Sequence, residues 1–135
     1  MNDDQFYREF ILDHFRNPRN YGRIENADIS HEEHNPFCGD LVGIDIKLRD
    51  GVIEQAAFHG RGCAISQASA SLMTERLRGM SLEDARAISK DDVLEELGIE
   101  ISPARLKCAL LSLKALKVGA YGLANYDPEE DEEEA

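Results

Sequence analysis

The amino-terminal segment carries apolar residues at the spacing of an amphipathic helix. Within residues 3–17 these residues recur three and four positions apart, and acidic residues stand at the beginning, where the helix dipole favours negative charge. The Asn17-Pro18 pair predicts the end of this helix, because the residue before a proline avoids helical geometry. Residues 19–36 are predicted as loop, with a short strand near residues 27–30. The residues at this helical spacing are Phe6, Phe10, Ile11, His14 and Phe15.

Strict alternation of apolar and polar residues follows this loop. Val42, Ile44, Ile46 and Leu48 are separated by small or polar residues, a pattern typical of a strand with one buried face. The Asp50-Gly51 pair predicts a hairpin turn into a second strand.

The register of this hairpin depends on the length of its turn. A two-residue turn sets His59 opposite Val42. A three-residue turn, with Gly51 in the left-handed conformation, sets Phe58 opposite Val42 instead. Because the second register matches apolar with apolar residues, it is the one that we predict.

After the hairpin the sequence predicts helices only. A helix rich in small residues follows the bend at residues 60–62 and ends near residue 78, and two short helices come next. A long final helix is expected over residues 104–121, with a proline in its first turn. The N-cap residues that we expect are Ser81, Ser89 and Ser102, and the glycines that end helices are Gly79 and Gly98.

This order of elements predicts an α+β fold, with helices covering a small antiparallel sheet of about three strands and a long C-terminal helix. The chain has 135 residues, enough for one domain with a hydrophobic core, which we place at residues 1–126. No apolar run is long enough to span a membrane and residues 1–4 do not begin a secretory signal, so we expect a cytoplasmic protein.

Charge is concentrated at the carboxyl terminus. The net charge is −12, and seven acidic residues of the tail at residues 127–135 account for much of it. We expect this acidic tail to be disordered and solvated. Nucleic acid is an unfavourable partner, because the sequence offers no basic face to phosphates.

Three cysteines stand at the edges of predicted elements. Cys38 precedes the first clear strand, Cys63 precedes the small-residue helix 25 residues later, and Cys108 lies in the final helix, another 45 residues on. An odd number of cysteines is unusual for a disulfide framework. A hairpin returns the chain to its starting end, so we expect Cys38 and Cys63 to be neighbours.

Asp40 adds an oxygen ligand to this group. Residues i and i+2 of an extended segment point to the same side, so Cys38 and Asp40 can face one ion. Together with Cys63 and Cys108 they form a set of donors that suits tetrahedral Zn²⁺ or iron bound to sulfide. Simple packing of the cysteines and a turn-capping role for Asp40 remain alternatives.

Four stretches resemble the NifU N-terminal-like iron–sulfur assembly proteins, the IscU and SufU group. They are ILDHFRNPRNYG, NPFCGD, GRGCAISQASASLMTE and ARLKCALLSLKAL, and together they extend from the first helix to the last. The resemblance implies an α+β domain that accepts sulfur from a pyridoxal-phosphate cysteine desulfurase. It also implies that the domain builds a transient 2Fe–2S or 4Fe–4S cluster and passes it to apo acceptor proteins, acting as a scaffold rather than as a turnover catalyst.

The same resemblance implies roles for individual residues. Cys38, Asp40, Cys63 and Cys108 correspond to the metal or cluster ligands, and Cys108 to the thiol that accepts persulfide sulfur. Lys107 stands where IscU-type members have histidine, which is similar to the SufU type, whereas the short interval between the second and third cysteines is similar to the IscU type.

Three functions therefore remain open at the level of the sequence. They are a cluster scaffold, a SufU-type zinc-dependent sulfur acceptor, and a protein-interaction module with a structural zinc site. IscU-type members present a Leu-Pro-Pro-Val-Lys segment to an Hsp70-type chaperone. Because residues 101–105 here read Ile-Ser-Pro-Ala-Arg, the resemblance does not extend to that partner.

Overall fold

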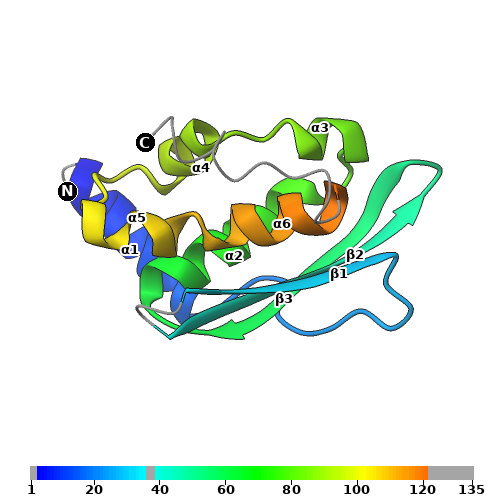
Figure 1. Cartoon of the computed structure of the whole chain (residues 1–135). Helices are drawn as coiled ribbons and strands as arrows, with labels where there is room; N and C mark the ends of the chain where they lie inside the picture. Colours follow the sequence, from blue (N-terminus) through cyan, green and yellow to red (C-terminus); the bar gives the residue numbers. More distant parts are fainter. Residues whose placement is uncertain (1–2, 36–38, 122–135) are drawn as a thin grey trace.

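The computed structural model describes residues 3–35 and 39–121 as a three-stranded antiparallel sheet packed against helices, which confirms the predicted α+β class (Figure 1). No helix within these residues is both long and apolar enough to cross a membrane. The strands are β1 (Ile29–Asn35), β2 (Asp40–Arg49) and β3 (Val52–Arg61). The helices are α1 (Asp3–Arg16), α2 (Ala64–Leu77), α3 (Leu82–Arg86), α4 (Lys90–Leu97), α5 (Pro103–Ala109) and α6 (Leu111–Tyr121).

The sheet has the order β1-β2-β3, so β2 is the central strand. Helices lie on one of its faces, and the segment between α1 and β1 runs along the other side (Figure 1). This segment is fixed to the sheet by Asp45, which is 1% exposed and accepts hydrogen bonds from the Ser30 hydroxyl, the Ile24 backbone N–H and the Arg23 guanidinium. Burial alone would raise the pKa of Asp45, but these three donors outweigh it and lower the pKa below its ordinary value.

Strand β1 is longer than the sequence predicted. The prediction placed a short strand near residues 27–30, whereas the structure continues the strand to Asn35. Its segment ISHEEHN alternates between half-buried and exposed side chains, but the half-buried positions include His31 and Glu33, so no apolar alternation marks it. A charged edge strand of this kind protects a sheet from pairing with other chains.

The predicted three-residue turn between β2 and β3 is wrong. Asp50 and Gly51 have φ of 52° and 79°, and Arg49 pairs with Val52, which is the geometry of a two-residue hairpin turn. The predicted register therefore fails from the first pair onward.

A β-bulge beside Lys47 and Leu48 restores the matching of apolar side chains. It inserts one extra residue in β3, so that Ile44 pairs with Phe58. Since an extra residue reverses which positions face the helices, Ile53 and Phe58 can both be buried, at 0% and 1% exposure. The apolar side chains of β3 are thus turned toward the core by a bulge within the strand rather than by a longer turn before it.

Helix α2 follows β3 and lies in the middle of the molecule. Its small residues allow close contact with α1, β3, α5 and α6. The buried positions are Ser66, Gln67, Ala68, Ser69, Ala70, Ser71, Leu72, Met73, Thr74 and Leu77.

The predicted beginning of α3 and both predicted ends of α4 are confirmed. The Ser81 and Ser89 hydroxyls accept hydrogen bonds from backbone N–H groups of the first helical turns, and Gly98 ends α4 in the left-handed conformation. The expected long helix after Ser102, by contrast, is divided into α5 and α6 at Leu110, whose φ and ψ are −99° and 2°. The Ser69 hydroxyl donates a 2.8 Å hydrogen bond to the Ala109 carbonyl beside this division.

Candidate functional site

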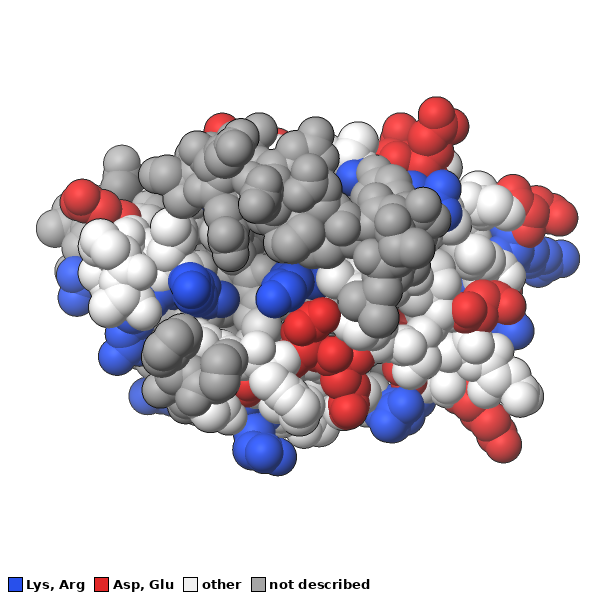
Figure 2. Space-filling model, in the orientation of Figure 1, with Lys and Arg blue, Asp and Glu red and all other residues white. Residues whose placement is uncertain are grey.

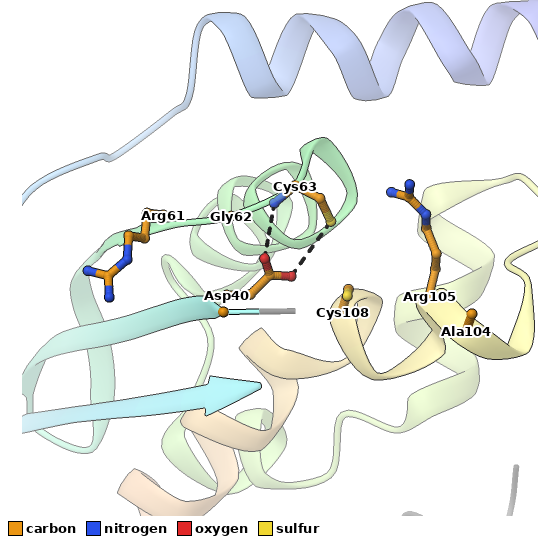
Figure 3. A pocket seen from close by; sticks show the side chains of 8 residues that line it. Asp40, Arg61, Gly62, Cys63, Ala104, Arg105 and Cys108 are labelled. Carbon is orange, nitrogen blue, oxygen red and sulfur yellow. Dashed lines mark hydrogen bonds between the residues drawn. The ribbon is translucent and has the colours of Figure 1, made fainter. Parts of the chain in front are cut away.

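An open pocket of about 560 Å³ lies where β2, β3, α2 and α5 meet. Three of its residues are ones that the sequence analysis selected, and they come from three different elements. Figure 3 shows their side chains directed toward a common region. The pocket is lined by Gly39, Asp40, Arg61, Gly62, Cys63, Ala104, Arg105 and Cys108.

Asp40 and Cys63 are in direct contact in this pocket. Asp40 is 2% exposed at the start of β2, and its Oδ1 accepts a 3.2 Å hydrogen bond from the Cys63 backbone N–H (Figure 3). The Cys63 thiol lies 3.7 Å from Oδ2 of the same carboxylate. One oxygen of Asp40 therefore caps the beginning of α2 while the other faces the thiol.

Cys63 is the N-cap residue of α2. Its sulfur accepts a hydrogen bond from the Ser66 backbone N–H at 3.5 Å. A helix amino terminus favours negative charge. The fold thus supplies both a donor and a favourable dipole to this sulfur, which suits a thiolate ligand.

Gly62 allows the carboxylate and the helix to approach each other. A Cβ atom at this position would lie 2.4 Å from Asp40 Oδ1 and 2.7 Å from the Ser66 hydroxyl oxygen, both too short for any side chain. Its φ of +151° is also a conformation that residues with side chains rarely adopt. A glycine is therefore required for this contact.

Cys108 completes the group from α5. It is 2% exposed, and its sulfur accepts a 3.5 Å hydrogen bond from Nδ2 of Asn35. Lys107, the preceding residue, is exposed.

The donor atoms of Asp40, Cys63 and Cys108 all lie within 4.8 Å of one another. Ligand atoms about 2.0–2.3 Å from a tetrahedral ion are about 3.3–3.8 Å apart, so small side-chain movements bring these three onto one ion. One carboxylate and two thiols form a donor set that fits Zn²⁺ or the iron of a cluster. A fourth position remains for a further ligand.

Cys38, the residue predicted for this fourth position, lies outside the described residues. The hairpin does bring its two ends together, since Asp40 at the start of β2 contacts Cys63 just after β3. No histidine belongs to the metal-ligand group found among the described residues, and His14 is buried against the Ser71 hydroxyl, with His14 Nδ1 and Ser71 Oγ 2.8 Å apart.

Two features of the site were not predicted from the sequence. The Asn35 amide contacts a cysteine 73 positions away in the chain, so no local pattern signals it. The glycine pair around Arg61 was recognised as a bend, but its steric role beside Asp40 depends on the tertiary contact.

Arginine side chains stand at the rim of the pocket. Arg61 and Arg105 both line it and both are exposed, and Figure 3 shows Arg61 directed away from the Asp40 carboxylate. Figure 2 shows basic side chains toward the end of the molecule formed by α1 and α5, and a mixture of charges toward the β2–β3 turn. The rim therefore carries two exposed arginines, although the sequence as a whole is acidic.

Comparison with known proteins gives consistent results. The profile of the family described as NifU-like N terminal domain matches residues 6–131. The zinc-dependent sulfurtransferase SufU of Bacillus subtilis is 40% identical, over 87% of this chain and 91% of that protein. The iron–sulfur cluster assembly scaffold protein IscU of Escherichia coli K12 is 42% identical, over 82% of this chain and 88% of that protein.

Solved structures share the fold. One is a crystal structure from Fervidobacterium islandicum AW-1, described as a scaffold protein for iron–sulfur cluster assembly in the SUF system. It superposes with a TM-score of 0.72 at 30% identity, covering 88% of this chain and 99% of that one. The N-terminal part of a NifU-like protein from Brucella abortus gives 0.70 at 26% identity, covering 98% of each chain.

Proposed function

This chain belongs to the NifU-like N-terminal domain family, and from that membership we propose that it is a scaffold for iron–sulfur cluster assembly. In this role it accepts sulfur from a pyridoxal-phosphate cysteine desulfurase, holds a labile cluster, and transfers the cluster to apo acceptor proteins. It is a carrier and assembly site rather than a turnover catalyst.

The observation that carries the proposal is the convergence of Asp40, Cys63 and Cys108 in an open pocket. We assign Cys38, Asp40, Cys63 and Cys108 as the ligands. A carboxylate oxygen is a harder ligand than a thiolate and holds iron of a cluster less durably, so a mixed set suits a cluster that has to be released. An open pocket likewise gives an acceptor protein access to it.

The cluster is cargo in this proposal, and the residues of the chain determine how it is held. Cys108 accepts persulfide sulfur. Cys63 lies at the amino terminus of α2, where the helix dipole favours the negative charge of a thiolate ligand. Asp40 fixes that amino terminus with one oxygen and keeps the other for iron.

A zinc-dependent sulfur acceptor is the second candidate. Two observations favour it, namely the 40% identity to a zinc-dependent sulfurtransferase over most of both chains and Lys107 in place of a histidine before Cys108. In that case Zn²⁺ occupies the four ligands and only the persulfide is passed on. The two functions share the site and the desulfurase partner. They differ in whether iron binds to the ligands and forms a cluster there.

One anaerobic experiment separates the candidates. The protein with zinc bound and the zinc-free protein are each incubated with a cysteine desulfurase and cysteine, and the mass of the intact protein is recorded. Ferrous iron and dithiothreitol, whose thiols supply the electrons that reduce persulfide sulfur to sulfide, are then added, and visible absorption is followed. A scaffold develops sulfide-to-iron absorption in the zinc-free form, whereas a zinc-dependent sulfur acceptor gains a sulfur atom on Cys108 only with zinc bound and remains colourless. A protein that does neither in either form would be a structural zinc module, and the proposed function would be wrong.

The variants Cys63→Ser and Cys108→Ser test the shared site. Each is expected to lose zinc and cluster binding and to have a lower melting temperature when zinc is present, because metal bound only by the folded state stabilises it. The control is Ser102→Ala, since the Ser102 hydroxyl makes no capping hydrogen bond at the start of α5. Full zinc occupancy in Cys63→Ser, by elemental analysis, would contradict the shared site.

A further inference from the structure

Asn35 contacts the site without being one of its expected ligands. It is the last residue of β1 and is 5% exposed, so its amide is withdrawn from solvent. Its Nδ2 atom donates to Cys108 Sγ at 3.5 Å, an ordinary separation for an N–H group and a sulfur atom. A buried amide that donates to a candidate ligand can affect how that ligand binds.

The position of Asn35 is fixed by the sheet. It pairs with Asp40 across β1 and β2, and its carbonyl accepts a 2.8 Å hydrogen bond from the Gly39 backbone N–H. This last pair of the two strands thus contacts both cysteines of the pocket, Asp40 touching Cys63 and Asn35 touching Cys108.

Cys108 is held from the other side through its neighbour in the chain. The Ala109 carbonyl accepts the Ser69 hydroxyl of α2, at the point where α5 ends. Helix α5 itself has only seven residues. The Asn35 amide supplies a contact to the sulfur itself.

We propose that Asn35 is a positioning residue, whose amide holds Cys108 Sγ toward Asp40 and Cys63 and reduces the negative charge on that sulfur when it binds a metal ion. The proposal rests on the ligand role of Cys108 in the proposed function. Hydrogen bonds to a charged sulfur are stronger than those to a neutral one, so the amide contact strengthens when Cys108 is a thiolate. Groups that hydrogen-bond to a metal ligand tune the metal affinity of the site, and hydrogen bonds to the sulfurs of a cluster tune its reduction potential.

The test replaces the donor while keeping its shape. In Asn35→Asp a carboxylate oxygen faces the sulfur, so repulsion replaces the hydrogen bond, and Asn35→Ala removes the donor without adding charge. Affinities for Zn²⁺ and Co²⁺ are measured by competition with a chelator, and the thiolate-to-cobalt charge-transfer band is recorded. We expect the affinity for both metal ions to fall about 10–100-fold in Asn35→Asp, the range found when a hydrogen-bond partner of a metal ligand is lost. The decrease in Asn35→Ala should be smaller.

The band position distinguishes positioning from a structural role. A sulfur that has lost its hydrogen bond holds its electrons less tightly, so the band should move to longer wavelength in both variants. Circular dichroism of the metal-free proteins checks the fold. The matched control is Asn20→Asp, which makes the same change at a residue whose amide donates to the Thr74 hydroxyl at 3.2 Å, far along the sequence from the cysteines.

The outcomes are distinct from those of the proposed function. Native affinity and an unmoved band in Asn35→Asp, together with a weaker thiolate-to-cobalt band in Cys108→Ser, would overturn the role of Asn35 and leave the scaffold intact. A thiolate-to-cobalt band of undiminished intensity in Cys108→Ser would overturn the ligand role of Cys108, and the positioning role with it.

Discussion

At the scale of single residues, β2 carries two buried carboxylates with different surroundings. Asp45 accepts hydrogen bonds from three groups that fix the loop before β1. Asp40 contacts Cys63 and lies within reach of Cys108. Burial alone therefore does not identify a ligand, whereas the nature of the neighbouring atoms does.

Replacing Asp40 tests its role in cluster release. We expect Asp40→Ala to slow transfer of a reconstituted cluster to an apo-ferredoxin, because the hard oxygen ligand is lost and sulfur ligation dominates. Loss of the cap on α2 should also cost about 0.5–2 kcal/mol of unfolding free energy. The decay of visible absorbance, recorded without oxygen, measures the transfer.

Asp45→Ala provides the matched control for this substitution. It removes a carboxylate of the same strand and should lower stability without changing the transfer rate. Equal transfer rates in the native and Asp40→Ala proteins, together with reduced stability of the latter, would leave Asp40 with a capping role alone.

At the scale of elements, the features that the sequence predicted correctly are those that depend on residues close together in the chain. The caps Ser81, Ser89 and Gly98 depend on contacts within one helical turn, and all three are found as expected. The division at Leu110 involves a hydroxyl from α2, and the register of the hairpin involves a bulge, so neither is encoded in a local pattern. Strand β1 was shortened in the prediction because its inward positions are polar.

The same distinction applies to the candidate site. Asp40 and Cys63 could be placed together from the sequence because a hairpin returns to its starting end. Cys108 was added to the donor set as the third thiol, but its place beside Asp40 and Cys63 depends on how α5 packs and follows from no local pattern. The Asn35 contact could not be predicted by either route.

The packing of α1 on α2 should make stability depend on pH. His14 is 2% exposed, and burial is the main cause that lowers its pKa, with a further contribution from the charge of Arg19. Glu75 and Asp13 act in the opposite direction but do not outweigh these effects. The unfolded chain therefore binds a proton at His14 more readily than the folded chain.

It follows that the stabilising contribution of His14 is complete above its ordinary pKa of about 6.5. The contribution is lost as the pH falls below that value and through the lower pKa of the folded state. Urea unfolding at several pH values should show a smaller decrease in His14→Gln than in the native protein. The control is His34→Gln, at an exposed histidine, and an unchanged pH dependence in His14→Gln would contradict the prediction.

At the scale of the whole molecule, charge and core are separated along the chain. The buried apolar residues of the described structure lie between Ile11 and Ala120, whereas residues 127–135 contain seven acidic residues and no large apolar one. A segment of this composition cannot bury enough apolar surface to offset the cost of ordering. We therefore propose that residues 1–126 form the domain and that the acidic tail is not needed for its folding.

Truncation after Tyr126 tests this division. We expect the melting temperature and the zinc affinity to remain unchanged, because a segment of this composition has too little apolar surface to add to the core. A full-length variant with the seven acids replaced by their amides serves as the control, since it changes charge without changing length. A clear loss of stability in the truncated protein alone would show that the tail packs on the domain.

The assembly of one pocket from three segments has a consequence in time. Asp40 and Cys63 belong to the first half of the chain, while Cys108 follows Cys63 by 45 residues. At about 5–20 residues per second, a ribosome needs about 2–9 s to synthesise that interval. During those seconds a growing chain presents Asp40 and Cys63 without their third partner. The complete group of donors therefore exists only after α5 has been made and packed, so loading with metal or sulfur is an event of the finished protein.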